Sequence, residues 1–219
     1  MARSTLKLAF IDRDGVINVR RKDPDDPMKH YVLTWDAFEW MPGAIEAIAK
    51  LLDNDYAVIV VSNQSGIGQG VADYFEVDHI FQKMVKTIRG VTRRPHSRLW
   101  YSFCPHTTED DCVCRKPQPG LIISHLVELN ARTANAWMIG DADTDMEAGW
   151  NAGIDKLIKL PSYEEPEIPE YKYVDIAADV PVEENAAPVV ANLTVAVDFL
   201  LRWDREDAHK ANQAAGLCI

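Results

Sequence analysis

Two aspartates, Asp12 and Asp14, follow a short apolar run from Leu6 to Ile11. Paired carboxylates at the end of a strand can bind a hard divalent cation, and one of them can attack a phosphorus centre once the cation screens the charge of the substrate. An acidic surface turn is the simpler alternative. A calcium loop does not fit, because Gly15 stands at the fourth place of the loop and not at the sixth.

A second group of residues has the composition of a metal site. Cys104, His106, Cys112 and Cys114 supply three thiolates and one imidazole, which is the ligand set of a closed, tetrahedral zinc site. Clustered in this way, the cysteines do not resemble a disulfide framework. Four protein ligands leave no position for an activated water, so we expect Zn²⁺ to fold the loop 104–114 and to take no part in catalysis.

Arg115 and Lys116 directly follow this loop. An isolated lysine is usually a solvated surface charge, but the position of this pair after a metal site favours two fixed cations. Arg115 can bind a second anionic group of a substrate through two hydrogen bonds, so we expect it to contribute to substrate recognition.

The elements that must position these residues alternate between strand and helix. Strands are expected at 6–11, 57–61, 99–103, 136–139 and 156–160, and helices are expected at 42–52, 73–89, 120–130, 144–151 and 189–203. This order predicts an α/β fold with a Rossmann-like parallel sheet and helices on both of its faces. Because the chemistry of such sheets gathers at the carboxyl ends of the strands, Asp12, Ser62 and Asp141 should converge.

Length and composition indicate one domain that covers residues 1–219. The chain has 47% hydrophobic residues and a formal net charge of −11, which argues against binding to nucleic acid or to an anionic membrane surface. No apolar run reaches the roughly 18 residues of a bilayer span, and no signal-type segment follows Met1. We therefore expect a cytoplasmic monomer. Residues 19–41 could form a flap, residues 161–188 an irregular segment, and residues 204–219 a polar tail.

Four motifs in this order resemble the haloacid dehalogenase superfamily of aspartate-nucleophile phosphatases. They are Asp12-Arg13-Asp14-Gly15, Ser62-Asn63, Lys116 and Gly140-Asp141. The fuller stretches at 10–18, 62–68 and 114–117 are similar to the branch that contains heptose bisphosphate phosphatases and histidinol phosphate phosphatases. The resemblance implies a phosphatase with a minimal cap, with Mg²⁺ as catalytic cofactor and with a small phosphate ester as its binding partner.

The resemblance also implies a role for each motif residue. Asp12 would form a phosphoaspartyl intermediate, and Asp14 would protonate the leaving alkoxide and then activate water. Mg²⁺ would be held by the Asp12 carboxylate, the Asp14 backbone carbonyl and Asp141. Ser62 and Asn63 would donate hydrogen bonds to the phosphoryl oxygens, and Lys116 would stabilise the charge that develops there.

The substrate is less sharply indicated than the reaction. Ala142 stands where both kinds of relative usually carry a basic residue. The stretch Ser-Asn-Gln-Ser-Gly-Ile at 62–67 and the dipeptide Tyr31-Val32 favour a heptose bisphosphate. The alternative substrates are histidinol phosphate and a polynucleotide 3′-phosphate, and the negative net charge argues against the polynucleotide. A non-catalytic, zinc-stabilised binding protein is a further alternative, against which the intact Asp12 and Asp14 argue.

Overall fold

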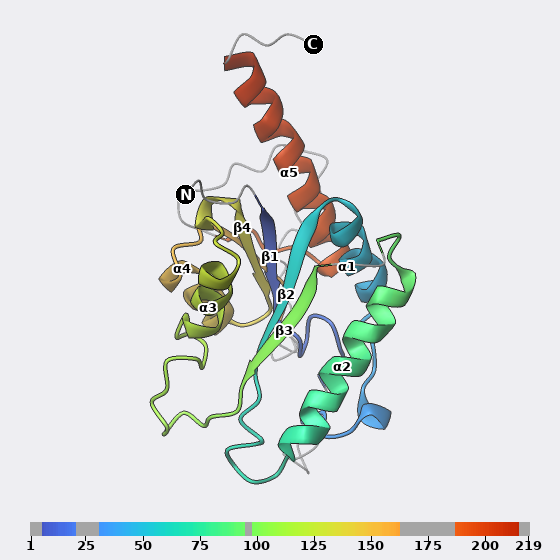
Figure 1. Ribbon diagram of the computed structural model, residues 1–219, viewed down its shortest axis with the longest axis vertical. Helices are drawn as coiled ribbons and strands as arrows, with labels where there is room; N and C mark the ends of the chain where they lie inside the picture. Colours follow the sequence, from blue (N-terminus) through green and yellow to red (C-terminus); the bar gives the residue numbers. More distant parts are fainter. Residues whose placement is uncertain (1–5, 21–30, 95–97, 163–186, 215–219) are drawn as a thin grey trace.

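The structure is a computed structural model of the 219-residue chain, and it describes residues 6–20, 31–94, 98–162 and 187–214. A five-stranded parallel sheet with the order β3-β2-β1-β4-β5 forms its centre (Figure 1). The strands are β1 (Lys7–Ile11), β2 (Tyr56–Asn63), β3 (Leu99–Cys104), β4 (Ala136–Gly140) and β5 (Lys156–Lys159). The helices are α1 (Ala44–Asp53), α2 (Tyr74–Val91), α3 (Gly120–Glu128), α4 (Asp143–Asn151) and α5 (Leu193–Ala214), with short 3-10 turns η2 (Trp35–Ala37) and η3 (Thr133–Asn135).

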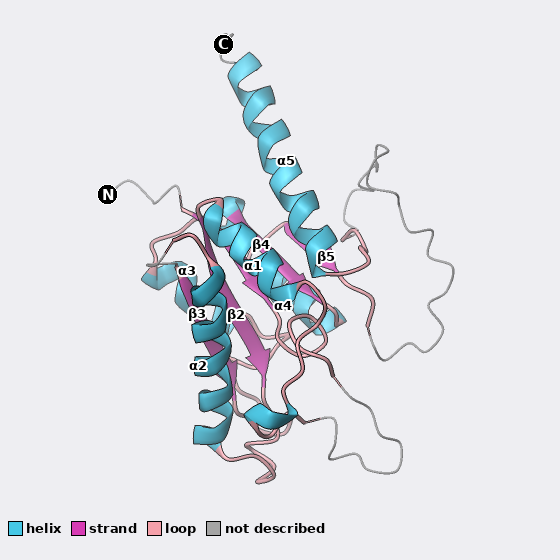
Figure 2. Cartoon of the chain, turned by 90° about the vertical axis from the view of Figure 1, so that its right-hand side faces the viewer, coloured by secondary structure: helices cyan, strands magenta, loops and turns pink. Residues whose placement is uncertain are grey.

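Helices cover both faces of the sheet, as the alternation of elements predicts (Figures 1 and 2). Ala9 and Ile11 of β1 pack in one buried cluster with the apolar sides of α1, α2 and α5. Leu8 and Phe10, which point to the opposite face, pack in a second cluster with α3 and α4. Because successive side chains of a strand alternate between the faces, a strand covered on both sides is apolar along its buried length, as β1 is from Leu8 to Ile11. The predicted α/β class and parallel sheet are confirmed.

The register of the central strands aligns the chemical motifs at one edge of the sheet. Ile11 of β1 is paired with Val60 of β2 and with Ile139 of β4. The backbone N–H of Asp12 donates to the carbonyl of Ile139 at 2.9 Å, which continues the ladder for one residue beyond β1. The three strands are parallel, so their carboxyl ends lie at the same edge of the sheet.

The long connection after β1 is tied together at its two ends. The Val19 N–H donates to the Glu39 carbonyl at 2.8 Å, and the Met41 N–H donates to the Ile17 carbonyl at 2.9 Å. Between them, the rings of Trp35 and Phe38 stack, the Trp40 ring meets both of them edge-on, and all three pack against the larger core cluster. Residues 21–30 of the predicted flap lie outside the described residues, as do residues 163–186 of the predicted irregular segment. The flap itself stays a prediction.

The last helix differs from the prediction, since it begins later and ends later than 189–203. It runs from Leu193 to Ala214, and its second half extends beyond the body of the molecule (Figure 1). The polar residues predicted to form a tail after position 203 are therefore helical as far as Ala214. Asp204 anchors this half, because it accepts a hydrogen bond from the Tyr56 hydroxyl and lies 3.0 Å from the Lys7 ammonium. The polar residues beyond it are compatible with a helix that faces solvent, and residues 215–219 lie outside the described part.

Within the described residues, no helix is both long and apolar enough to cross a bilayer.

Candidate active site and metal sites

A pocket of about 230 Å³ lies at the carboxyl ends of the central strands. Every residue predicted for the magnesium and phosphate sites lines it: Asp12, Asp14, Ser62, Asn63, Arg115, Lys116 and Asp141. Four segments far apart in the chain supply these side chains. The structure thus brings together all the residues that sequence analysis places in the catalytic site.

Asp12 lies at the centre of a buried cluster of opposite charges. The Lys116 ammonium is 2.5 Å from Asp12 Oδ1 and 2.5 Å from Asp145 Oδ1, and it also donates to the Val61 carbonyl at 2.8 Å. Burial alone would lower the pKa of Lys116, but the carboxylates of Asp12 and Asp145 raise it above its usual value. The lysine therefore remains charged and neutralises part of the negative charge of the cluster.

Three carboxylates lie close enough to share a cation. Ligand oxygens of Asp12, Asp141 and Asp145 lie within 4.8 Å of one another. The pKa of Asp12 is raised to about 7, chiefly by burial; Lys116 lowers it, and the charges of Asp145 and Asp14 raise it. Burial and the charges of Asp12 and Asp145 raise the pKa of Asp141 to about 8. Both shifts mean that this buried, metal-free site disfavours the charged forms of the two carboxylates, chiefly through burial.

The contacts of these acids fit a divalent cation at Asp12 and Asp141. Asp141 Oδ2 is buried and has no hydrogen-bond partner within the described part of the chain, which leaves a lone pair for a metal. Asp145 is already engaged with other groups, because Oδ1 forms an ion pair with Lys116, although no hydrogen bond, and Oδ2 accepts from the Ala142 N–H at 3.1 Å. Magnesium prefers oxygen ligands of this kind, and usually only one or two of them are carboxylates.

The Asp14 carboxylate is held away from this cluster by five hydrogen bonds. Arg13 donates from Nε to Oδ1 at 3.2 Å and from Nη2 to both oxygens at 2.8 and 2.9 Å. Asn18 donates to Oδ1 at 3.0 Å, and Gln64 donates to Oδ2 at 2.8 Å. Although burial raises the pKa of Asp14, the Arg13 charge and these hydrogen bonds lower it below its usual range. The two neighbouring aspartates therefore have opposite pKa shifts.

Ser62 and Asn63 occupy different positions in the pocket. The Ser62 hydroxyl accepts a hydrogen bond from Gln64 Nε2 at 2.8 Å, which leaves its own proton for another acceptor. The Asn63 amide pairs with the main chain of Lys116, accepting from its N–H at 2.9 Å and donating to its carbonyl at 2.9 Å. Asn63 thus fixes the lysine backbone, a contact that its sequence position does not reveal, and one further N–H of its amide remains for the predicted phosphoryl contact.

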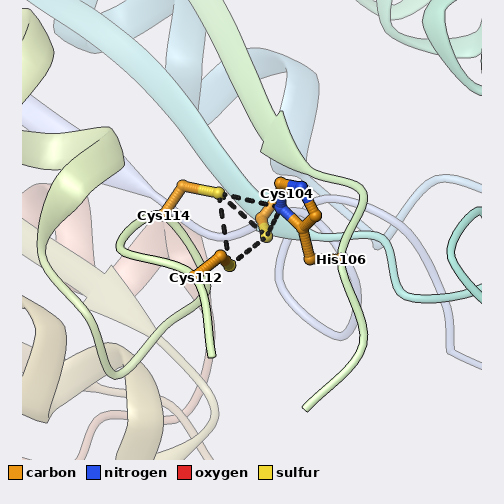
Figure 3. Close-up of side chains that lie close together, drawn as sticks. All are labelled: Cys104, His106, Cys112 and Cys114. Carbon is orange, nitrogen blue, oxygen red and sulfur yellow. Dashed lines mark hydrogen bonds between the residues drawn. The ribbon is translucent and has the colours of Figure 1, made fainter. Parts of the chain in front are cut away.

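The predicted zinc ligands meet at one point beside the end of β3 (Figure 3). Their Sγ and Nδ1 atoms lie 3.2 to 3.5 Å apart for Cys104, His106, Cys112 and Cys114. Four soft ligands that face a common centre are compatible with a tetrahedral zinc ion. The loop also anchors Arg115, whose Nη1 donates to the His106 carbonyl at 3.2 Å.

Sequence analysis missed three residues of the site: Arg13, Gln64 and Asp145. Arg13 is almost fully buried, with its guanidinium over the Phe81 ring at 4.7 Å from the centroid. The position of Asp145 carried a signal, because it lies in the first turn of α4, where an acidic side chain can accept a hydrogen bond from the N-cap N–H. Gly140 permits the approach of Asp145, since a Cβ there would lie 2.3 Å from Asp145 Oδ2. For Arg13 and Gln64 the sequence offered no comparable signal.

Comparison with known proteins gives consistent results. Residues 113–161 match the model of the HAD-hydrolase-like family. The D-glycero-beta-D-manno-heptose-1,7-bisphosphate 7-phosphatase of Neisseria meningitidis serogroup A is 36% identical over 196 residues, which cover 84% of this chain and 98% of the relative. The bifunctional histidine biosynthesis protein HisB of Legionella pneumophila is 35% identical over 153 residues, or 69% of this chain and 40% of the relative.

A solved structure with the same architecture has a bound metal and phosphate. It is the D,D-heptose 1,7-bisphosphate phosphatase from B. bronchiseptica, complexed with magnesium and phosphate. It superposes with a TM-score of 0.67 at 25% identity, and the alignment covers 90% of this chain and 99% of that chain.

Proposed function

The chain belongs to the haloacid dehalogenase-like phosphatases, and on this basis we propose that it hydrolyses a phosphate monoester of a small phosphorylated sugar, with Mg²⁺ as cofactor. The favoured substrate is D-glycero-beta-D-manno-heptose 1,7-bisphosphate, from which the 7-phosphate would be removed. The observation that carries the proposal is the single pocket in which Asp12, Asp141 and Lys116 meet the Ser62 hydroxyl.

In the first step, an Asp12 oxygen forms a bond to phosphorus while the bond from phosphorus to the sugar oxygen breaks. Asp14, which has to take up a proton before this step because its hydrogen-bond donors favour the carboxylate form, gives that proton to the leaving oxygen. Ser62 and Asn63 orient the phosphoryl group, and Lys116 stabilises the charge on its oxygens. Mg²⁺ held by Asp12, Asp141 and the Asp14 carbonyl would neutralise the repulsion between the nucleophile and the phosphate.

In the second step, water attacks the phosphorus, and the bond between phosphorus and Asp12 breaks. Asp14 takes the proton of the water, so that inorganic phosphate leaves and the Asp12 carboxylate is restored. This sequence uses Asp14 once as an acid and once as a base. Asp12 acts as the nucleophile and would also hold the magnesium ion, but it transfers no proton.

Cations at the pocket wall support a substrate with two phosphates. Arg115 and Arg20 both line the pocket, and the Arg20 charge acts on Asp141. Since Lys116 would be engaged at the reacting phosphate, an arginine at the wall can bind a second anionic group bidentately. This distribution favours a bisphosphate over a monophosphate.

Histidinol phosphate is the second candidate, because one relative that covers 69% of this chain is a histidine biosynthesis protein. Phosphate release should therefore be measured with the heptose 1,7-bisphosphate, the heptose monophosphates, histidinol phosphate, other phosphosugars and an oligonucleotide 3′-phosphate. We expect the highest kcat/KM with the heptose bisphosphate. A higher value with histidinol phosphate would replace this assignment, and no metal-dependent release from any ester would remove the proposed enzyme activity.

A further inference from the structure

Arg13 is a buried cation that takes no part in the reaction steps described above. Its side chain is 1% exposed and lies between the Phe81 ring and the Asp14 carboxylate. A buried arginine is costly unless its hydrogen bonds are satisfied and its charge is compensated. Its bidentate contact with Asp14 meets much of this requirement, and the Phe81 ring packs against the guanidinium.

Gln64 extends this contact to the phosphate-binding side of the pocket. Its Oε1 accepts from Arg13 Nη2 at 3.2 Å, and its Nε2 donates both to Asp14 Oδ2 and to Ser62 Oγ at 2.8 Å. Gln64 itself is buried. One continuous set of hydrogen bonds therefore runs from Arg13 through Asp14 and Gln64 to Ser62, and the Phe81 ring packs against its Arg13 end.

We propose that Arg13 and Gln64 are positioning residues, which hold the Asp14 carboxylate at a fixed place relative to Ser62 for the attack of water on the phosphoaspartyl group. Arg13, Asn18 and Gln64 act as donors to Asp14, so this arrangement presents the carboxylate as a proton acceptor. A proton acceptor is what the second step requires, in which the water proton passes to Asp14 and the bond between phosphorus and Asp12 breaks. This inference rests on the proposed phosphatase function and deepens it.

The two steps can be separated with dinitrophenyl phosphate, whose leaving group needs no proton. With this ester, transfer of the phosphoryl group to Asp12 should not depend on Asp14, whereas hydrolysis of the phosphoaspartyl group should depend on it. Rapid mixing with Mg²⁺ then gives the rate of the first turnover as a burst of dinitrophenolate, and the following linear phase gives the second step. A defect of folding or metal binding would instead lower both phases together.

For Arg13→Met we expect the burst rate to change by less than about threefold and the linear phase to fall by about a hundredfold, the usual scale of general base catalysis. Acid-quenched samples should contain more phosphoenzyme than the wild type. The matched control is Arg89→Met, since Arg89 donates to the Leu99 carbonyl and lies outside the pocket. We expect this control to retain both phases.

An equal fall of both phases in Arg13→Met, or no change in either, would overturn the proposal. If that variant does not fold, Gln64→Met decides by the same criterion, because it removes the link to Ser62 without removing a buried charge. A wild-type protein without metal-dependent turnover of any ester would remove the proposed function itself. If instead the wild type hydrolyses the esters and the variants lack the expected pattern, only the positioning role of Arg13 and Gln64 is overturned.

Discussion

Lys116 and Asp12 form a buried ion pair of 2.5 Å although they lie 104 positions apart in the chain. The same ammonium pairs with Asp145, so one cation compensates two carboxylates. The lysine is positioned through its main chain by Asn63, whose own position follows from the pairing of β2. The sheet therefore determines where this charge lies.

Removal of the Lys116 charge should affect both activity and stability. We expect Lys116→Met to lower kcat by about a hundredfold to a thousandfold, as for the loss of one electrostatic group at an oxyanion. It should also lower the melting temperature, because two buried carboxylates lose their partner. Lys50→Met is the control, since Lys50 pairs with Asp198 on the surface. Steady-state kinetics and thermal unfolding of both variants measure this, and equal effects would contradict the assigned role of Lys116.

Magnesium should stabilise the protein more strongly at higher pH. Burial raises the pKa of Asp12 to about 7 and that of Asp141 to about 8, from 3.8 in the unfolded chain. The folded, metal-free protein thus binds more protons than the unfolded chain, so its stability should fall as the pH rises from about 4 to about 8. Bound Mg²⁺ displaces these protons and removes the penalty.

Thermal unfolding with and without Mg²⁺ between pH 6 and 8.5 measures this linkage. We expect the increase in melting temperature that Mg²⁺ causes to grow across this range. Calorimetry in buffers of different ionisation enthalpy should show proton release near pH 7. A magnesium effect that is the same at all these pH values would mean that the carboxylates do not titrate with the metal.

Gly15 should be essential for magnesium binding because of its contact with Asp141. It has a φ of +89°, and a Cβ at this position would lie 2.3 Å from Asp141 Oδ2. We expect Gly15→Ala to weaken Mg²⁺ binding by at least about tenfold, roughly 1.4 kcal/mol. Gly70→Ala is a matched control, because Gly70 also has a positive φ, of +71°, but has open space around it. A calorimetric Mg²⁺ titration of both variants checks this, and similar affinities would refute the steric argument.

Loss of zinc should act mainly on substrate binding. We expect Cys112→Ser to lose the metal, to unfold at a lower temperature and to raise KM more than it lowers kcat, because Arg115 is anchored to the His106 carbonyl. Elemental analysis, thermal unfolding and steady-state kinetics test the three effects, with Cys218→Ser as the control that retains zinc. Full stability and activity of a metal-free Cys112→Ser would disprove the structural role.

The sheet and the four motifs could be predicted because their signals are local. A β-branched or apolar run such as Ala57–Val61 identifies a strand, and the residue after it lies at the functional edge. The contacts of Arg13, Gln64 and Asp145 depend on which strands are neighbours and on side-chain directions, which no spacing in the sequence reports. Asp145 was the easiest of the three to predict, because it lies in the first turn of α4, shortly after the Gly140-Asp141 motif.

The end of the chain was misjudged for a related reason. Residues after Asp204 are polar, and polarity alone does not distinguish a frayed tail from a solvent-exposed helix. The contacts that hold Asp204 come from Lys7 and Tyr56, at the start of β1 and β2. Such long-range partners cannot be inferred from the composition of the segment.

The most direct test of the account is to find the residue that receives the phosphoryl group. A single turnover of the heptose bisphosphate, radiolabelled at its 7-phosphate, with Mg²⁺, acid quench and peptide mapping should place an acid-stable, hydroxylamine-sensitive label on Asp12. Asp12→Asn should show neither label nor turnover, with its fold and zinc content unchanged. Label on another residue, or magnesium-dependent hydrolysis by Asp12→Asn, would contradict the account.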